Sequence, residues 1–211
     1  IKLDIIMAFV LVFNLGLGYW CIQHLSFIDF RAYKIGKSIP LQMQTSCPPK
    51  YAYIMTKDGK DFTFDSYPTD TTYIYKDMKL TNPECMPKIT DYAIWNDQGD
   101  YTKATFEGKK LVILILNVNK ADVNHLPEIN TLIENLKNTD ISPLVFTASD
   151  KESYEAFKNK YQLNVPYYFA DGVVLKTIIR SNPGILYLKD GTVAGKWHHN
   201  DVPTAESILK L

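Results

Sequence analysis

The sequence has few cysteines and no net charge, and both shortages exclude classes of function. Its 211 residues include three cysteines, none of them in a C-x-x-C pair, which excludes a cysteine-rich scaffold and a thiolate zinc site. The 23 basic side chains balance 23 acidic ones, so no electrostatic attraction to nucleic acid is expected. Glycine-rich phosphate loops and a serine-histidine-acid arrangement are not detectable either. The residues therefore indicate no cofactor and no nucleic-acid partner.

Charge is also missing from one long segment. Residues 5–27, IIMAFVLVFNLGLGYWCIQHLSF, contain no Asp, Glu, Lys or Arg. At about 1.5 Å per residue, a helix of this length matches a hydrocarbon core of roughly 30 Å. We therefore predict a transmembrane helix over residues 1–28, in which Asn14, Gln23 and His24 are the polar exceptions. There are two alternatives. One is a buried core helix, and the other is a secretory signal, although no Ala-x-Ala cleavage site follows the segment.

The charges that flank this segment bear on its orientation. Lys2 lies before it, and Arg31, Lys34 and Lys37 lie after it, which favours a cytoplasmic position for the remaining residues. The first residue is Ile1 rather than methionine, which suggests a fragment or a processed product. A fragment can lack its stronger basic flank, so the local charge count is weak evidence.

Residues 29–85 are predicted to form a linker and a small β extension. Three prolines make residues 38–50 an extended segment. The runs YAYIMTK and KDFTFDSY are separated by Asp58 and Gly59, which supply the positive φ angles of a type I′ hairpin turn. A further β-rich run, TTYIYKDMKL, follows. The segment is too short to be an independent domain.

Residues 86–211 alternate between strand and helix patterns. A short hairpin is expected around Gln98 and Gly99, and the apolar run LVILILNV at residues 111–118 is typical of a central strand buried on both faces. The next elements are an amphipathic helix from Val123 to Leu136, a second buried strand in ISPLVFTAS, and a helix whose capping box begins at Ser149. Pro127 should kink the first helix or lie in its first turn.

The end of the chain predicts a second hairpin. VPYYFAD is expected to be extended and VVLKTIIR helical, and ILYLK and TVAGKW then pair through a type I′ turn at Asp190 and Gly191. Pro183 precedes this hairpin in a position that tolerates a cis bond. A final helix, AESILKL, is capped near Thr204. The order of elements predicts an α/β three-layer sandwich with a parallel strand pair and an added antiparallel hairpin.

Residues 86–211 resemble the thioredoxin-like fold, through the segments ITDYAIWNDQG, GKKLVILIL, LPEIN and RSNPGILYLKDGTVAGKW. In that family a strand leads into the redox motif, the first helix holds a kinking proline, and a cis-proline faces the motif. Pro127 and Pro183 match the two prolines. The resemblance implies a three-layer sandwich with a cis bond at Pro183.

The whole chain also looks like the C-terminal part of a Bacteroidetes-type DoxX family membrane protein, a likeness that includes the run FIDFRAYKIG. In such proteins a four-helix membrane domain is followed by one more helix and a thioredoxin-like domain. The resemblance implies an inner-membrane location, with residues 29–211 on the periplasmic side. It also makes the DoxX-like membrane domain a candidate partner.

The family's cysteines are missing from this chain. Registering the first helix on Pro127 places Asn119 and Asp122 where the two cysteines would be, and a peroxidatic cysteine is also absent. By the same likeness, the backbone before the cis-proline would pair with an extended peptide. The predicted binding groove consists of six residues: Asn119, Lys120, Asp122, Ser181, Asn182 and Pro183.

Two of the three cysteines are candidates for a disulfide. Cys47 and Cys85 each lie close to proline in linker-like sequence, which suits a structural bridge better than a displaced redox pair or two free thiols. His125, His198, His199 and Asp201 invite a metal hypothesis, but neighbouring residues on a strand point to opposite faces. A hydrogen-bonded or exposed histidine pair is the preferred interpretation.

Three functions remain open. The first is a membrane-anchored thioredoxin-like binding or accessory module without redox cysteines and without enzymatic activity. The second is a thiol-disulfide oxidoreductase, or a redox accessory, that uses Cys47 and Cys85 or cysteines of a membrane region outside this sequence. The third is a domain that only stabilises or positions its membrane partner.

Overall fold

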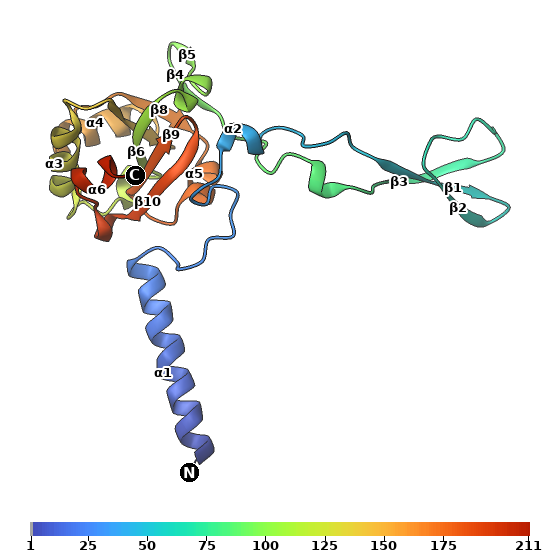
Figure 1. Cartoon of the computed structure of the whole chain (residues 1–211), viewed down its shortest axis with the longest axis horizontal. Coiled ribbons are helices and arrows are strands. Elements are labelled where there is room, and N and C mark those ends of the chain that lie inside the picture. The colour runs from blue at the N-terminus through green and yellow to red at the C-terminus, as the bar shows by residue number, and fades with distance from the viewer. Residues whose placement is uncertain (1) are drawn as a thin grey trace. The chain divides into compact units, whose positions relative to one another are not determined.

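The computed structural model describes residues 2–211 and divides the chain into two compact units. The large unit combines Ile1–Pro40 with Asp91–Leu211, and the small unit is Leu41–Thr90. Residues 29–40 thus group with the large unit. The division at residues 28 and 85 that the sequence suggested stays a prediction. Figure 1 shows the elements of both units.

A seven-stranded mixed sheet forms the centre of the large unit, in the order β10-β9-β6-β7-β8-β4-β5. β6 is parallel to β7 and β7 is parallel to β8, whereas β9, β10, β4 and β5 join by antiparallel pairing. The strands are β4 (Ile94–Asn96), β5 (Gly99–Asp100), β6 (Lys109–Ile115), β7 (Ile141–Thr147), β8 (Tyr167–Ala170), β9 (Gly184–Lys189) and β10 (Thr192–His198). The segment predicted only as extended, VPYYFAD, therefore supplies a third parallel strand.

Helices cover both faces of this sheet (Figure 1). α3 (Leu126–Leu136), α4 (Lys151–Tyr161) and α6 (Ala205–Leu209) pack in one hydrophobic cluster with the alternate residues Leu111, Ile113 and Ile115 of β6. α5 (Gly172–Ile178) packs against β7. Residues 111–115 are buried on both faces, as the uninterrupted apolar run predicts. The result is the predicted three-layer sandwich.

The first helix of the sandwich begins later than its periodicity suggested. α3 starts at Leu126 rather than Val123, so Pro127 lies in the first turn, where its missing N–H costs no helical hydrogen bond. Residues 121–125 form a loop, preceded by the short 3-10 helix η3 (Val118–Lys120). Asn119 and Asp122 therefore lie outside the helix that would carry the family's cysteine pair.

The closing hairpin agrees with its prediction. β9 and β10 pair antiparallel from Lys189 and Thr192, and the two residues between them, Asp190 and Gly191, have φ angles of 47° and 71°. Both values are positive, as a type I′ turn requires. The Asn182–Pro183 peptide bond is cis, as predicted.

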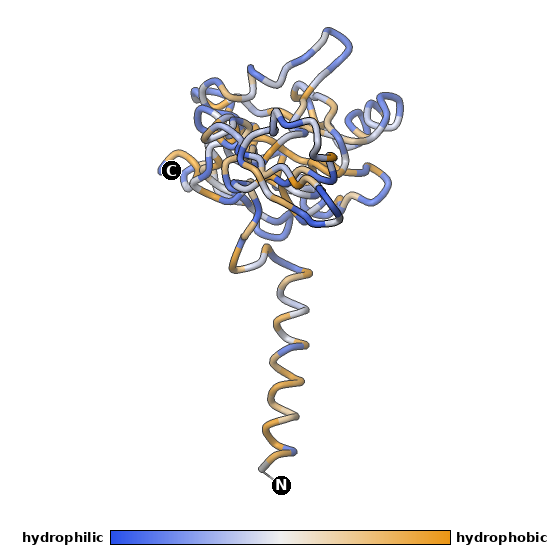
Figure 2. Tube along the Cα trace, turned by 90° about the vertical axis from the view of Figure 1, so that its right-hand side faces the viewer, coloured by the Kyte–Doolittle hydropathy of each residue, from blue (hydrophilic) through white to orange (hydrophobic). Residues whose placement is uncertain are grey.

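α1 (Lys2–Gln23) is apolar, and its residues 3–22 are exposed. The most apolar 18-residue window of its segment Leu3–Gln23 has a mean hydropathy of 2.1, and none of this window is buried in the structure. Figure 2 shows the hydrophobic residues that run along it. A core helix would be buried, so that alternative is wrong. The helix has the length and composition to span a membrane, features that membrane anchors share with signal sequences.

The small unit is a three-stranded antiparallel sheet of order β2-β1-β3. Its strands are β1 (Tyr51–Lys57), β2 (Lys60–Phe64) and β3 (Ile74–Leu80), and the predicted hairpin turns at Asp58 and Gly59. Met55 is the one buried residue in these strands. A disulfide joins Cys47 to Cys85, at the end of the 3-10 helix η1 (Pro83–Cys85). The one-turn helix α2 (Ile39–Gln42) interrupts the segment predicted to be extended.

Candidate functional site at the cis-proline loop

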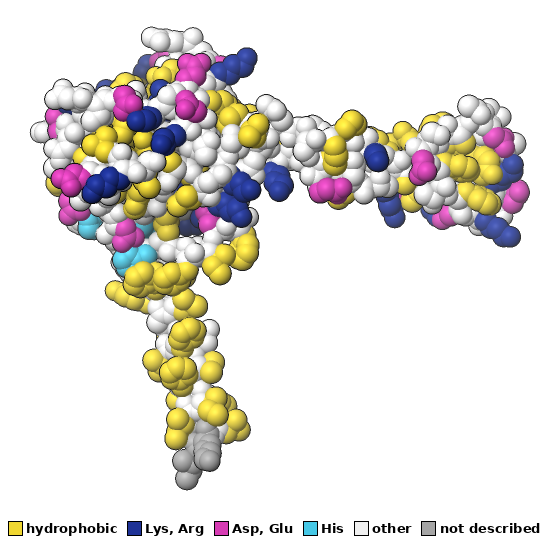
Figure 3. Space-filling model, in the orientation of Figure 1, with side chains coloured by type: hydrophobic (Ala, Val, Ile, Leu, Met, Phe, Trp, Pro, Cys, Tyr) yellow, Lys and Arg dark blue, Asp and Glu magenta, His cyan; other side chains and the backbone are white. Residues whose placement is uncertain are grey.

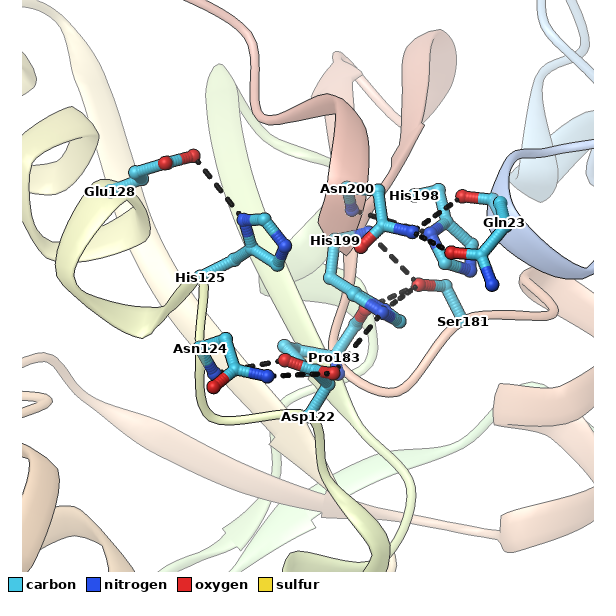
Figure 4. A network of polar contacts seen from close by, with 10 residues as sticks. All are labelled: Gln23, Asp122, Asn124, His125, Glu128, Ser181, Pro183, His198, His199 and Asn200. Atoms are coloured by element: carbon cyan, nitrogen blue, oxygen red, sulfur yellow. Dashed lines mark hydrogen bonds and ion pairs between the residues drawn. The ribbon is translucent and has the colours of Figure 1, made fainter.

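Three segments that are distant in the sequence meet at one end of the central sheet. They are residues 117–125 after β6, residues 181–183 before β9, and residues 198–201, which begin with the last residue of β10. β9 lies between β6 and β10 and is antiparallel to both, so the start of β9 is adjacent to the ends of the other two strands. Figure 4 shows the polar contacts of these segments, which we call the cis-proline site.

The backbone beside the cis-proline is already hydrogen-bonded within the chain. The Asp122 N–H donates to the Asn182 carbonyl oxygen at 2.8 Å. The Asn182 Nδ2 donates to the Asn117 carbonyl oxygen at 2.8 Å, and the Asn117 side chain caps η3 through the Asn119 N–H at 2.9 Å. These bonds fix the loop after β6 against the cis-proline loop. Asn182 Oδ1, by contrast, is buried and has no hydrogen-bond partner among residues 2–211.

Ser181, His199 and Asp122 lie in series at this site, an arrangement that the sequence did not reveal. Ser181 Oγ is 2.9 Å from His199 Nδ1, and His199 Nε2 is 3.8 Å from Asp122 Oδ2. The same Oγ also accepts the His199 N–H at 3.0 Å and donates to the Pro183 carbonyl oxygen. The Ser181 hydroxyl group already donates its hydrogen to one group and accepts a hydrogen bond from another. Its oxygen is therefore not free to act as a nucleophile in this geometry. The arrangement orients His199 toward Asp122.

Burial lowers the basicity of the two adjacent histidines. Burial, and then the neighbouring His199, lower the pKa of His198 to about 4. The pKa of His199 is also lowered by burial, against the opposing effect of the Asp122 carboxylate. Both side chains are therefore neutral at pH 7 and can accept as well as donate hydrogen bonds.

The geometry gives little support to a metal site formed by the histidines and Asp201. β10 ends at His198, so the rings of His198 and His199 come together with centroids 4.0 Å apart. His198 Nδ1, however, accepts the Asn200 N–H at 3.3 Å, and Asp201 pairs with His24 at 2.7 Å. Among residues 2–211 the structure shows no group of three or more metal-type ligands.

All four histidines of the chain lie at or next to this site, and two side chains of the apolar segment reach it. His24 Nδ1 is 2.7 Å from Asp201 Oδ1. Asn200 Nδ2 donates to the Gln23 carbonyl oxygen at 2.8 Å and to Gln23 Oε1 at 2.9 Å. The sequence showed Gln23 and His24 as polar exceptions near the helix end. Their partners, however, are 177 residues away, and no local pattern indicates them.

The structure brings together only part of the predicted groove. Asp122, Ser181, Asn182 and Pro183 share the network described above. Asn119 instead lines a separate open depression beside α4, together with Glu152 and Phe157 among others. Lys120 donates its backbone N–H to the Asn117 carbonyl oxygen at 3.1 Å. The groove as a set of six residues stays a prediction.

No protein-family model matches the sequence, and no curated protein matches it significantly. Among solved structures, a thiol-disulfide oxidoreductase from Bacteroides fragilis is 14% identical and covers 57% of this chain and 97% of its own, with a TM-score of 0.46. The thioredoxin domain of a Bacteroides vulgatus thiol-disulfide oxidoreductase is 12% identical and covers 56% and 91%, with a TM-score of 0.45.

A secreted disulfide oxidoreductase of Mycobacterium tuberculosis is 14% identical, covers 57% and 96%, and has a TM-score of 0.42. These TM-scores lie below 0.5, so the class of the large unit rests on its own architecture. The strand order, the helical crossovers between parallel strands and the cis-proline before β9 define a thioredoxin-like domain.

Proposed function

We propose that this chain is a membrane-anchored, extracytoplasmic thioredoxin-like module that binds or assists a partner and carries out no thiol chemistry at its cis-proline. The observation that carries this proposal is the bond from the Asp122 N–H to the Asn182 carbonyl. By the registration on Pro127, Asp122 stands where a redox member of the family would have its second cysteine, so this bond would take the place of the cysteine motif beside the cis-proline. The turn between β6 and α3 contains no cysteine.

This internal bond also changes how a partner would bind. An extended peptide that pairs with the backbone before a cis-proline needs the carbonyl that Asn182 already uses. A peptide partner would therefore have to share this carbonyl oxygen with the Asp122 N–H, displace the loop at Asp122, or be recognised by side chains such as Asp122 and His199. The DoxX-like membrane domain is the alternative partner. For that partner, the contacts of Gln23 and His24 with residues 200–201 hold the cis-proline site next to the end of α1.

The disulfide supports the location of the module. Disulfides persist in oxidising compartments such as the bacterial periplasm and are rare in the cytosol. The pairing of Cys47 with Cys85 therefore favours an inner-membrane protein with residues 29–211 in the periplasm, against the local charge count around α1. Alkaline extraction of membranes, with protease protection of residues 41–90, tests the anchor and its orientation together.

A second candidate function is thiol-disulfide exchange through Cys47 and Cys85. Cys85 is buried, but Cys47 is exposed and offers one sulfur of the bridge to an attacking thiolate. The Asn82 Nδ2 lies 3.7 Å from Cys47 Sγ and 3.2 Å from Cys85 Sγ, so this amide group contacts both sulfur atoms of the bridge.

Thiol mapping separates the two functions. The binding proposal expects the Cys47–Cys85 bridge to resist a mild dithiol at neutral pH while Cys21 reacts with a thiol reagent in detergent. Rapid exchange of the bridge with a dithiol substrate would favour the oxidoreductase instead. Deletion of residues 38–211 tests the purely stabilising role, for which the abundance of the membrane partner should fall.

A further inference from the structure

We propose that a pocket at the foot of α1 binds the anionic headgroup of a membrane phospholipid. The pocket has a volume of about 330 Å³. Three cationic side chains, Arg31, Lys34 and Lys196, line it together with apolar Leu25, Phe27 and Ile35. Of the proposed function, this inference uses only the assumption that α1 spans a membrane.

The charges of the pocket leave room for an anion. Asp29 accepts hydrogen bonds from Arg31 Nε at 2.7 Å, Arg31 Nη2 at 3.0 Å and Lys196 Nζ at 2.7 Å. Burial by itself raises the pKa of Asp29. The hydrogen bonds from Arg31 and Lys196 together have the larger effect and bring the pKa below its usual value, so the carboxyl group stays ionised. Three cations against this one carboxylate leave a formal charge of +2 in the lining, three minus one.

One donor of Arg31, a residue that lines the pocket, lacks a partner among residues 2–211. Arg31 Nη1 is buried and makes no hydrogen bond to any of residues 2–211. A buried guanidinium N–H without an acceptor is costly, and a phosphate oxygen is the acceptor that a guanidinium group matches best. Lys34 is exposed at the rim, where its ammonium group can reach a second phosphate oxygen.

The surroundings of the pocket identify the source of the phosphate as a lipid. Phe27 is 72% exposed and Phe30 is 89% exposed, directly after the apolar helix ends at Gln23. Exposed apolar side chains of this kind can insert at the boundary between the headgroups and the acyl chains, the level at which residues 25–35 lie if α1 crosses the hydrocarbon core. Figure 3 shows hydrophobic side chains along α1 and at its junction with the large unit, with Lys and Arg beside them. Inorganic phosphate has no apolar part that could contact these hydrophobic side chains, whereas a phospholipid has acyl chains that could.

Lipid binding to the full chain in neutral detergent micelles tests the proposal. Native mass spectrometry would compare phosphatidylglycerol with phosphatidylcholine for the wild type, K34Q and K37Q. We expect a preference for phosphatidylglycerol that K34Q reduces about fivefold, as estimated for one basic group near an anionic lipid surface. Lys37 is an exposed lysine of the same segment that does not line the pocket, so K37Q should retain the preference.

R31Q should abolish the preference, provided that tryptophan fluorescence shows a folded large unit. Three results would overturn the proposal: equal binding of the two lipids, equal losses in K34Q and K37Q, or displacement of the lipid by inorganic phosphate at a similar concentration. Rapid exchange of the Cys47–Cys85 bridge with a dithiol substrate, with the lipid preference intact, would contradict the proposed function and leave the lipid pocket standing.

Discussion

The same dipeptide closes a hairpin in each unit of this chain, with different consequences. Asp58-Gly59 joins β1 to β2, and Asp190-Gly191 joins β9 to β10, with φ angles of 51° and 72° in the first turn and 47° and 71° in the second. The local geometry is thus nearly identical. Five of the six residues of β9 are buried, whereas four of the five residues of β2 are exposed. Local sequence determines the turn, but packing determines how much stability depends on it.

The two units are also held together differently. The large unit buries whole strands between helices, as residues 111–115 illustrate. The small unit has a disulfide and aromatic pairs, such as Phe62 and Phe64 against Tyr73 with ring centroids 5.6 and 5.0 Å apart. The three tryptophans, Trp20, Trp95 and Trp197, all belong to the large unit, so tryptophan fluorescence reports on that unit alone.

The largest difference should come from truncating one strand residue beside each turn. Leu188→Ala removes a fully buried side chain from β9 and should lower the free energy of unfolding by about 2–5 kcal/mol. Phe62→Ala removes a side chain that is 40% exposed in β2 and should cost about 1 kcal/mol or less. Denaturant titration in micelles, followed by tryptophan fluorescence and by hydrogen exchange of residues 41–90, measures both. Equal costs would contradict the comparison.

Loss of the disulfide should destabilise only the small unit. The bridge joins cysteines 38 residues apart, and removing such a cross-link typically costs about 2–4 kcal/mol. In the double variant C47S/C85S we expect faster proteolysis and hydrogen exchange within residues 41–90, with an unchanged tryptophan transition. C21S is the matched control, since Cys21 is a free thiol in α1. A shift of the tryptophan transition in the double variant would show that the large unit depends on the bridge.

The glycines of the two turns provide a matched pair of substitutions. An alanine Cβ at Gly191 would lie 2.8 Å from Pro40 Cδ and 3.1 Å from Phe106 Cδ1, whereas at Gly59 no atom lies within 4 Å. Both variants adopt a left-handed backbone, at a cost of about 1–2 kcal/mol. Overpacking should add about 1–3 kcal/mol for Gly191→Ala alone. Thermal unfolding of the two variants, each followed in its own unit, checks this, and a Gly59→Ala cost as large as that of Gly191→Ala would refute it.

The last expected difference is a pH dependence that the buried His198 side chain gives to the large unit. The pKa of His198 falls from 6.5 to about 4 on folding, so between these values the unfolded chain binds a proton that the folded chain does not. Stability should therefore decrease as the pH falls from 6.5 to about 4 and be unaffected by this group above 6.5. The variant H198N should show a shallower decrease in the tryptophan-detected free energy of unfolding. An unchanged slope would show that His198 does not cause it.

Much of the fold could be predicted because its signals are local. Two-residue turns and apolar runs each occupy a few consecutive positions, and they placed both Asp-Gly hairpins and the buried strand, which ends at Ile115 rather than Val118. The capping box expected at Ser149 was wrong, because the N-cap of α4 is Asp150, whose side chain accepts the Ser153 N–H at 2.8 Å. The start of α3 was less predictable, because Val123 continues the apolar period, yet the chain stays in the loop that bonds Asp122 to Asn182. A tertiary hydrogen bond there outweighs helical periodicity.

The cis-proline site was predictable only in outline. The position and isomer of Pro183 followed from the resemblance, and the missing cysteines followed from the sequence itself. The series of Ser181, His199 and Asp122 did not, because it joins three segments whose separation along the chain carries no periodic signal. The same holds for the pocket at the foot of α1, where Lys196 meets Asp29 across 167 residues.

The sequence by itself determined the apolar helix, the two Asp-Gly turns, most of the order of strands and helices, and the absence of a cysteine pair beside the cis-proline. These properties depend on neighbours within a few residues or on composition. Only the tertiary structure decided which polar groups are satisfied and which, like Arg31 Nη1 and Asn182 Oδ1, have no partner among residues 2–211. Burial and hydrogen bonding at those atoms depend on chain segments that meet only after folding.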